Sequence, residues 1–249
     1  MNSLAVSEHF YSIQGEGAYV GVPSIFLRLK GCNLTCGGVN TVKSKQLDSA
    51  ATWRCDTIEV WLQGDRLTFD EIFEIFEENN YISLLKKGAH LIVTGGEPLL
   101  QHNELASFFS AFNTKYAFKP FVEIETNGTV AVKDNLACYI NQYNVSIKLA
   151  NSGMLLEKRV YPEVIASFVE KKRCSFKFVV NSKEDVDEVF ASVVSVFNIA
   201  YENVYLMPGA SSREQLLELE PVIIELCKAY CVNYSTRLHI HVWNQLTGV

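Results

Sequence analysis

The chain has 249 residues and a mass of 28.0 kDa, with 48% hydrophobic residues, 20% charged residues and a formal net charge of −6. This composition excludes a disordered tail protein and a collagen-like chain, because a globular chain of this length buries roughly 70 to 75% of its unfolded surface. The acidic balance argues against binding nucleic acid through a broad basic surface, so we predict no direct nucleic-acid partner.

Short apolar runs rich in Val, Ile and Phe alternate with stretches of helical period beyond residue 20, which is typical of successive βα units. The predicted strands are residues 24–29, 90–94, 121–126, 145–149, 175–180, 204–207 and 237–243. Seven strands with interleaved helices indicate a parallel sheet or an incomplete (β/α) barrel. No Pro-, Gly- or Ser-rich linker divides the chain, so we expect a single domain over residues 1–249.

The helices between these strands have recognisable starts. Thr68 and Glu71 have the spacing of a capping box, and the apolar residues that follow fall on one helical face. Ser212 with Gln215 repeats the pattern before residues 216–230. Ser182 with a carboxylate three residues later predicts a helix over residues 186–197.

The first residues lack the features of a targeting segment. Residues 1–7 have no basic segment followed by an apolar core, and no apolar run approaches the roughly 18 residues that span a bilayer. We therefore expect a cytoplasmic protein with no membrane partner. Seven cysteines are an odd number in a chain too long to need disulfides, which favours metal ligands or buried thiols.

Three of these cysteines gather after the first predicted strand. Cys32 and Cys36 are separated by three residues, and Cys36 and Cys55 by eighteen. The spacing alone leaves three interpretations open: small buried thiols, a zinc site or an iron–sulfur cluster. Residues 37–54 between them show neither a helical nor a strand period, and a loop of this length in a compact domain is usually functional or mobile.

The sequence around the cysteines resembles a known enzyme family. Residues 31–36, GCNLTC, resemble the opening of the radical S-adenosylmethionine motif, Cys-x3-Cys-x2-Cys, and residues 53–57, WRCDT, resemble its ending in one family. Further matching segments are TGGEP at 94–98, ETNG at 125–128, FYSIQGEG at 10–17 and LMP at 206–208. In this order the chain is similar, over nearly its whole length, to the 7-carboxy-7-deazaguanine synthases.

The chain departs from the usual motif at its second interval, where eighteen residues replace two. Val39 stands where the third ligand would normally follow, and Thr52 lies three residues before Cys55. Either residues 37–54 contain an insertion between two ligands, or Cys36 is accidental and the cluster abnormal. We favour the insertion, because loop-closure entropy grows by only roughly 0.6 kcal/mol per doubling of loop length.

The resemblance implies an incomplete (β/α) barrel with a [4Fe-4S] cluster, S-adenosyl-L-methionine and Mg²⁺ as cofactors. Cys32, Cys36 and Cys55 would hold the cluster and leave one iron to chelate the amino and carboxylate groups of S-adenosylmethionine. Cleavage of the sulfonium by one electron would then yield methionine and a 5′-deoxyadenosyl radical. Thr57 would contact Mg²⁺ through an oxygen atom, the ligand type that this ion prefers.

The resemblance also places S-adenosylmethionine at three successive strand ends. Glycines let the backbone approach a ligand, and Glu97 could accept from the methionine ammonium group. Polar side chains two residues apart at a strand end point to the same side. Without the resemblance, the alternative interpretation is that the glycines and Glu97 form a tight turn and that the other residues are solvated polar positions. The residues assigned to this cofactor are Gly95, Gly96, Glu97, Glu125, Asn127, Ser146 and Lys148.

For the substrate, the resemblance points to 6-carboxy-5,6,7,8-tetrahydropterin, which offers an amidine edge and a carboxylate. Gln14 and Glu16 could bind the amidine edge, and Arg28 could bind the carboxylate through two hydrogen bonds. His239 and His241 alternate on the last predicted strand and would face one side. We assign substrate binding to His239, with two structural histidines as the alternative.

The implied activity is conversion of this pterin to 7-carboxy-7-deazaguanine with loss of ammonia, in 7-deazapurine biosynthesis of the queuosine or archaeosine type. A flavodoxin-like or ferredoxin-like electron donor and a homodimer are the implied partners. Two alternatives remain. A glycyl-radical activating enzyme shares the cysteine and Gly-Gly-Glu motifs, and a zinc-stabilised binding module would need no catalysis.

Overall fold

The computed structural model describes residues 2–48, 50–246 and 248–249. Within these ranges one nine-stranded sheet has the order β3-β1-β2-β4-β5-β6-β7-β8-β9. Its strands are β1 (Ser3–Ile13), β2 (Pro23–Leu29), β3 (Asp65–Thr68), β4 (His90–Gly95), β5 (Phe121–Thr126), β6 (Gln142–Val145), β7 (Cys174–Val180), β8 (Val204–Pro208) and β9 (Asn233–Tyr234).

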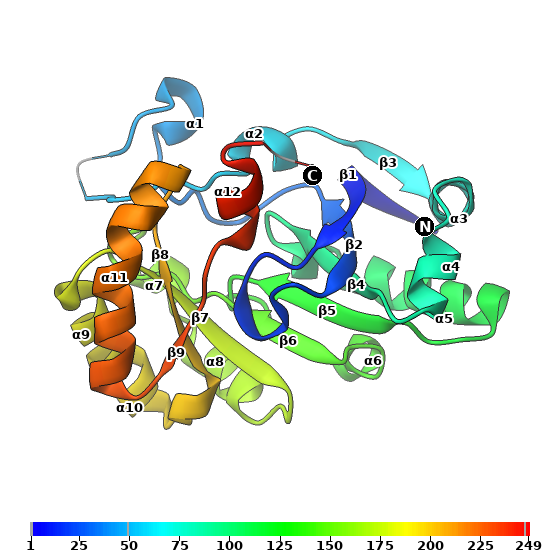
Figure 1. The fold of residues 1–249 in the computed structure, drawn as a ribbon. Coiled ribbons are helices and arrows are strands. Elements are labelled where there is room, and N and C mark those ends of the chain that lie inside the picture. The colour runs from blue at the N-terminus through cyan, green and yellow to red at the C-terminus, as the bar shows by residue number, and fades with distance from the viewer. Residues whose placement is uncertain (1, 49, 247) are drawn as a thin grey trace.

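The direction of the strands follows from the βα pattern. Each neighbouring pair from β2 to β9 is parallel, whereas β1 pairs antiparallel with both β2 and β3. In the described residues the edge strands β3 and β9 do not pair with each other, so the curved sheet stays open (Figure 1). The predicted α/β fold, an incomplete (β/α) barrel, is confirmed.

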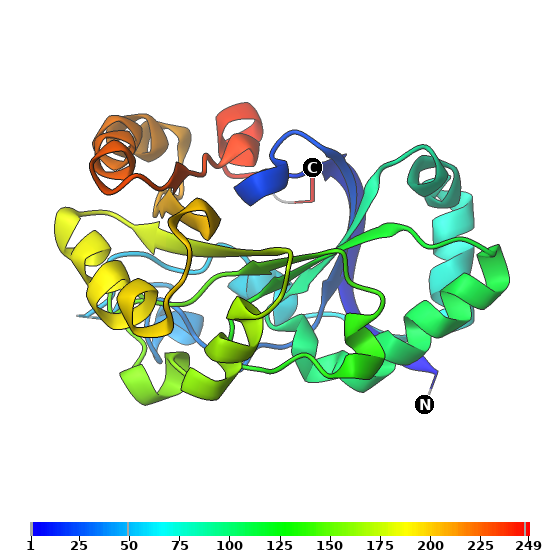
Figure 2. The ribbon, with the colours of Figure 1, turned by 90° about the horizontal axis from the view of Figure 1, so that it is seen from below.

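Helices cover the outer face of the sheet. Figure 2 shows the green and yellow helices along one side, whereas the red C-terminal helix and the dark blue loop after β1 lie on the other. The helices are α1 (Thr41–Ser44), α2 (Ile58–Trp61), α3 (Phe69–Glu78), α4 (Tyr81–Lys86), α5 (His102–Tyr116), α6 (Asp134–Ala137), α7 (Leu156–Arg159), α8 (Pro162–Val169), α9 (Lys183–Val189), α10 (Ser195–Phe197), α11 (Arg213–Tyr230) and α12 (Leu238–Trp243). A π-helical turn, Phe190–Val194, joins α9 to α10.

The predicted helix starts are found in the structure. Thr68 accepts from the Glu71 amide while the Glu71 carboxylate accepts from the Thr68 amide, which completes the capping box of α3. Ser212 caps α11 and Ser182 caps α9, since each side chain accepts from the amide three residues later. The capping box expected at Ser212 is not completed, because the side chain of Gln215 accepts from the Ser211 amide instead. The buried face of α3 then packs into the core that lies between the helices and the sheet.

The inner face of the sheet holds the alternate residues of each strand, which point away from the helices, and on β5 and β7 several of these are charged. In β7 the fully buried Phe176, Phe178 and Val180 belong to the apolar core, so Lys177 projects to the opposite face. In β5 the core side chains Val122 and Ile124 alternate with Glu123 and Glu125 in the same manner. This alternation collects charged side chains inside the open barrel.

The strand predicted at 237–243 is wrong, because the structure forms helix α12 there. The amides of Ile240 and His241 donate to the carbonyl of Arg237, which closes helical turns. Over only six residues, a period of two and a period of 3.6 are hard to distinguish. The expectation that His239 and His241 face the same side is therefore wrong as well. His241 contacts Glu220 on α11, whereas His239 lies near Glu16.

Other strand boundaries also differ from the prediction. The strand expected at 145–149 is β6 at Gln142–Val145, so Ser146 and Lys148 lie just beyond its end. Strands β1, β3 and β9 are absent from the prediction. None of the helices in the described ranges combines the length and apolar character needed to cross a membrane. The expected single domain, 1–249, includes Met1, Ser49 and Thr247, which lie outside the described residues, and Ser49 falls within the expected insertion.

Candidate active site

The candidate site lies where the ends of parallel strands β2, β4 and β5 meet. Cys32 follows β2, and the glycine pair 95–96 ends β4. A side chain at either glycine would collide with backbone: an added Cβ would lie 2.3 Å from the Leu29 carbonyl oxygen at Gly95 and 2.3 Å from the Gly31 carbonyl oxygen at Gly96. The two glycines therefore let the end of β4 pack directly against the start of the cysteine loop.

The three cysteines belong to one loop assembly. The amide of Cys55 donates to the carbonyl of Cys36 at 3.1 Å, so the chain returns to the point that it left before the eighteen intervening residues. The Sγ atom of Cys32 accepts from the Leu34 amide at 3.4 Å, and the Sγ atom of Cys55 lies 3.4 Å from the hydroxyl of Thr57. This return is the geometry that the insertion interpretation requires.

Burial is the main cause that raises the pKa of the Cys32 thiol to about 11 and that of Cys36 to about 12, and the charge of Cys55 contributes to both values. Lys148 acts in the opposite direction on both thiols. With these raised pKa values the free thiols stay protonated at neutral pH. Binding of a metal centre replaces the proton and stabilises the thiolate.

The cysteines fit an iron–sulfur cluster. In the described residues, no group of three His, Cys, Asp or Glu side chains converges on a single metal ion. A cubane cluster instead joins each thiolate to a different iron, so the thiolates surround the cluster. N–H donors aimed at sulfur, as at Cys32, and a neighbouring cation, as at Lys148, stabilise the charge of such a centre.

Glu97 is a structural centre of the site. Its side chain is buried, and its two oxygens accept from the Leu99 amide at 3.0 Å, the Asn127 amide at 2.7 Å and the hydroxyl of Thr126 at 2.9 and 3.0 Å. Burial raises the pKa of Glu97 to about 7, against the effect of these donors. The carboxylate thus joins the end of β4 to the end of β5, and its oxygens are already engaged by protein donors.

Asn127 and Lys148 border the cysteine loop. The amide nitrogen of Asn127 donates to Asn33 at 2.9 Å and lies 3.9 Å from the Sγ atom of Cys32. The Lys148 ammonium donates to Ser146 at 2.7 Å and lies 5.7 Å from the centre of the Trp53 ring. The three predicted cofactor residues that follow β5 and β6, Asn127, Ser146 and Lys148, therefore lie at the cysteine side of the mouth.

Glu125 belongs instead to a charged cluster inside the barrel. Lys177 donates to Glu125 at 2.7 Å and to Glu16 at 3.2 Å, while Gln14 donates to Glu125 at 3.1 Å. Asn144 joins Glu125 to Glu123 deeper in the barrel, and Glu123 pairs with His90 at 2.7 Å. Gln14 and Glu16, assigned to the substrate from the resemblance, thus contact side chains from two strands across the sheet, Glu125 on β5 and Lys177 on β7.

The charges around Glu16 keep it ionised. Burial acts to raise the pKa of Glu16, but the positive charges of Lys177 and Arg237 outweigh it and hold that pKa well below its usual range. Burial raises the pKa of Glu125, which also faces the negative charge of Glu16. Lys177, only 3% exposed, has its pKa raised by the two carboxylates despite its burial.

The two remaining predicted substrate residues are Arg28 and His239, of which His239 lies next to this cluster. Arg28 projects from β2 and its Nε atom donates to Glu8 at 2.7 Å. The Nε2 atom of His239 lies 4.0 Å from the carboxylate of Glu16, and burial lowers the pKa of His239. Both therefore contact carboxylates of the inner face, Glu8 from β1 and Glu16 from the loop after it.

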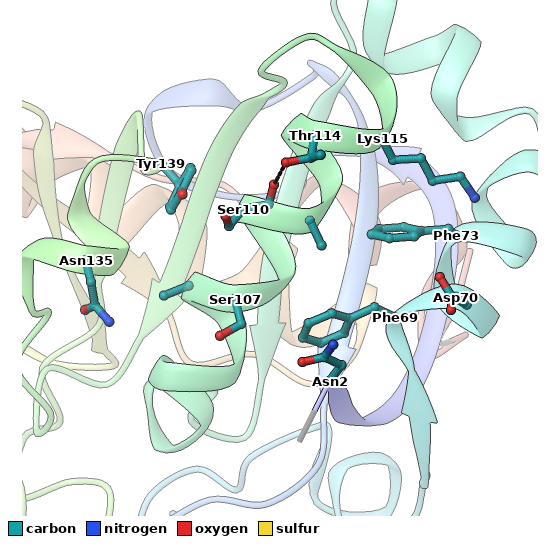
Figure 3. Close-up of a pocket in the computed structure, with 12 residues that line it drawn as sticks. Asn2, Phe69, Asp70, Phe73, Ser107, Ser110, Thr114, Lys115, Asn135 and Tyr139 are labelled. Carbon is teal, nitrogen blue, oxygen red and sulfur yellow. Dashed lines mark hydrogen bonds between the residues drawn. The ribbon is translucent and has the colours of Figure 1, made fainter.

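A cavity on the helical side is separate from these residues. It has a volume of about 640 Å³ and lies between α3 and α5, with Phe69, Phe73, Ser110 and Lys115 in its wall (Figure 3). None of the predicted cofactor or substrate residues lines it.

Comparison with known proteins assigns the family. Residues 13–148 match a family model described as a 4Fe-4S single cluster domain. The chain is 32% identical to the 7-carboxy-7-deazaguanine synthase of Pyrobaculum aerophilum over 98% of this chain and 97% of that one. The protein of the same name from Hyperthermus butylicus is 31% identical over 96% and 92%. The chain belongs to the 7-carboxy-7-deazaguanine synthase family.

A structural neighbour agrees with this assignment at the level of the fold. The crystal structure of QueE from Escherichia coli superposes with a TM-score of 0.63 and 20% identity over 95% of each chain. The 7-carboxy-7-deazaguanine synthase of Halobacterium salinarum is 26% identical over 97% of this chain and 91% of that one.

Three residues that contact the carboxylates of the site were not predicted from the sequence. Lys177, Arg237 and Asn144 contact the carboxylates of the inner face. A lysine in the middle of an otherwise apolar strand was a signal for Lys177. Arg237 and Asn144 gave no such signal. Arg237 is the first residue of the strand predicted at 237–243, and Asn144 lies just before the strand predicted at 145–149.

The expected insertion, residues 37–54, is tied to the barrel at its base. Gly37 donates to the Ser152 carbonyl, Thr52 to that of Asn151, and the indole of Trp53 to the Asn151 side chain at 2.9 Å. Thr41 is fully buried and accepts from Arg54. Residues 43–47, by contrast, are exposed.

Replacing residues 43–47 with a three-residue Gly/Ser bridge is expected to preserve the cluster, because the contacts of Gly37, Thr41, Thr52 and Arg54 all remain. Iron and sulfide analysis after anaerobic reconstitution should give about four of each per chain, as in the wild type. A folded variant without the cluster would show that the exposed tip shapes the metal site.

Proposed function

We propose that this protein converts 6-carboxy-5,6,7,8-tetrahydropterin to 7-carboxy-7-deazaguanine with loss of ammonia. The observation that carries the proposal is the meeting of two groups at one barrel mouth, in a chain that belongs to this family. One group is the three-cysteine loop, and the other is the cluster of half-buried carboxylates around Lys177.

The cysteine side of the mouth suits the cofactors. Cys32, Cys36 and Cys55 would hold a [4Fe-4S] cluster, and S-adenosylmethionine would lie beside Gly96, Asn127 and Lys148. When bound, the reduced cluster and S-adenosylmethionine would together supply the hydrogen-abstracting chemistry. Glu97 would act by fixing the ends of β4 and β5 rather than through a free carboxylate, since its oxygens already accept from protein donors.

The carboxylate side suits the pterin. Glu16, Glu125 and Asp56 carry three negative charges, and Lys177 and Arg237 carry two positive ones. Each oxygen of Glu16 accepts from one cation at 3.2 Å, and a carboxylate has about four acceptor positions, so each oxygen can still accept from an amidine N–H. A ligand edge rich in donors would satisfy both the acceptors and the charge.

Arg28 and His239 would complete the recognition of the substrate. The Nε atom of Arg28 donates to Glu8, so the two Nη groups of Arg28 would bind the pterin carboxylate. His239 lies against Glu16 with its ring 30% exposed, and it would donate to a ring carbonyl or amide of the pterin.

The proposal includes Mg²⁺, an electron donor and a second subunit. Thr57 follows Asp56 next to the cluster loop, and its hydroxyl would contact Mg²⁺ beside the substrate. A flavodoxin-like or ferredoxin-like protein would reduce the cluster one electron at a time, and the enzyme would act as a homodimer. The experiment that tests the function is turnover of the pterin under anaerobic conditions, with ammonium and 7-carboxy-7-deazaguanine measured in equal amounts.

Glu16→Gln is expected to impair pterin turnover far more than binding of S-adenosylmethionine, because a neutral amide loses the charge-assisted hydrogen bonds to the amidine edge. We expect the KM for the pterin to rise by at least about tenfold, equivalent to roughly 1.4 kcal/mol. Glu220→Gln, which alters a half-buried glutamate paired with His241 outside the site, is the matched control. Equal losses of pterin and cofactor affinity in Glu16→Gln would move this residue out of the substrate site.

A further inference from the structure

Arg237 contacts three different loops at the mouth of the barrel. Its Nε atom donates to Glu16 at 3.2 Å, and its other two nitrogens donate to the carboxylate of Asp56 and the carbonyl of Ala210. The side chain is only 12% exposed. These acceptors lie after β1, after the third cysteine and after β8, and a planar guanidinium holds several acceptors in fixed relative positions.

The segment around Arg237 also binds the backbone of the loop that carries Glu16. Ser235 accepts from the amide of Gly17 at 2.8 Å, and the amide of Leu238 donates to the carbonyl of Gly15 at 2.9 Å. A Cβ added at Gly15 would lie 2.4 Å from the Nδ1 atom of His239. Residues 235–239 therefore form a C-terminal clamp on the loop that carries Glu16, and Figure 2 shows the red helix α12 beside that dark blue loop.

We propose that Arg237 is a positioning residue that sets Glu16 relative to the cysteine loop. The inference rests on the proposed function, in which Cys55 binds the cluster and Glu16 binds the pterin. Asp56 is the residue after Cys55, so one guanidinium spans both halves of the site. Reacting atoms must approach within about 3 to 3.5 Å, and a misplacement of about 1 Å lowers the rate on the order of 100-fold, so this spacing controls coupling between the halves.

Two substitutions separate the geometry of Arg237 from its charge. Arg237→Met removes all three contacts, and we expect the KM for the pterin to rise by more than about tenfold. More 5′-deoxyadenosine should also be released per molecule of product. Arg237→Lys keeps the positive charge but lacks the planar fork, so it should recover part of the KM effect while the excess of 5′-deoxyadenosine persists.

Arg213→Met is the matched control. Arg213 begins α11 and donates to the carbonyls of His241 at 2.8 Å and Val242 at 3.0 Å. It therefore anchors the same helix α12 that follows Arg237, without touching Glu16 or Asp56. A general loosening of α12 would appear in both variants, whereas loss of the spanning contact would appear only at Arg237.

The experiment compares the reconstituted wild type, Arg237→Met, Arg237→Lys and Arg213→Met. Hydrogen–deuterium exchange followed by mass spectrometry reports on peptides that cover residues 14–17 and 55–58. Dithionite-driven assays then give the KM for the pterin and the ratio of 5′-deoxyadenosine to product. We expect faster exchange in both peptides and a raised ratio for the Arg237 variants, with iron content unchanged and Arg213→Met like the wild type.

Either of two results would overturn the inference: wild-type exchange and a wild-type ratio in Arg237→Met, or equal changes in Arg213→Met. If Arg237→Met does not fold, Arg237→Lys takes its place in the same comparison. Failure of the proposed function would give a different result, because the wild type itself would then form no 7-carboxy-7-deazaguanine. The exchange data would still decide whether Arg237 joins the two loops.

Discussion

Cys32→Ala, Cys36→Ala and Cys55→Ala are each expected to lose the iron–sulfur cluster and all turnover. Cys36 is the most informative of the three, because the eighteen residues that follow it break the usual spacing of the motif. The hydrogen bond from the Cys55 amide to the Cys36 carbonyl places both residues at the base of one loop. Iron and sulfide analysis with the visible absorption spectrum should show about four irons per chain in the wild type and a defective centre in each variant.

Cys227→Ala is the matched control for Cys36→Ala. Both thiols are buried, at 4% and 6% exposure, but Cys227 lies on α11 and its thiol donates to the Asn233 carbonyl. We expect full iron content and full turnover in this control. A Cys36→Ala variant with a complete cluster and wild-type turnover would contradict the insertion interpretation and assign the second ligand elsewhere.

Lys177→Met is expected to have the largest effect on stability. The lysine is 3% exposed and pairs with Glu16 at 3.2 Å and Glu125 at 2.7 Å. Removing it leaves two carboxylates in the barrel without their shared cation, and breaking a buried ion pair in this way costs about 3 to 5 kcal/mol. Urea unfolding at pH 7 should show this loss in the free energy of unfolding.

The effect of Lys177→Met should depend on pH. In the wild type the pKa of Glu16 is lowered, so the stability from this pairing is present above the ordinary pKa of a glutamate and is lost as the pH falls. In the variant, protonation of the carboxylates at low pH relieves their repulsion. The difference between the two proteins should therefore be largest near pH 7 and shrink towards pH 4.

Lys183→Met is the control for this measurement. Lys183 also binds a carboxylate, Asp187 at 2.6 Å, but its side chain is 63% exposed. Such surface pairs contribute about 0 to 1 kcal/mol. A Lys177→Met variant that is as stable as Lys183→Met at pH 7 would show that the inner carboxylates do not depend on the lysine.

Local sequence signals predicted much of the fold. Parallel strands buried on both faces, such as β4 with its run of Leu91, Ile92 and Val93, are readable because apolar residues concentrate over a short length. The capping box at Thr68 is readable because its two partners are three residues apart. The last element was misread because six residues that alternate histidine with apolar side chains satisfy a helix as well as a strand.

The candidate site was predictable only where its chemistry is local. The cysteines, the glycine pair and Glu16 lie in short motifs, so they could be named before their neighbours were known. The partners of Glu16 could not, since Lys177 and Arg237 are 161 and 221 residues away and meet it only through the curvature of the sheet. For the same reason, the donors that Glu97 receives from Thr126 and Asn127, at the end of the neighbouring strand, could not be named from the sequence.

The most direct test of the central claim is identification of the reaction product. Anaerobically reconstituted protein would be incubated with 6-carboxy-5,6,7,8-tetrahydropterin, S-adenosylmethionine, Mg²⁺ and dithionite, and the mixture analysed by liquid chromatography and mass spectrometry. Cys36→Ala, carried through the same procedure, would serve as the blank. The account predicts 7-carboxy-7-deazaguanine and an equal amount of ammonium from the wild type alone. Cleavage of S-adenosylmethionine to 5′-deoxyadenosine with the pterin unchanged, over many turnovers, would contradict it.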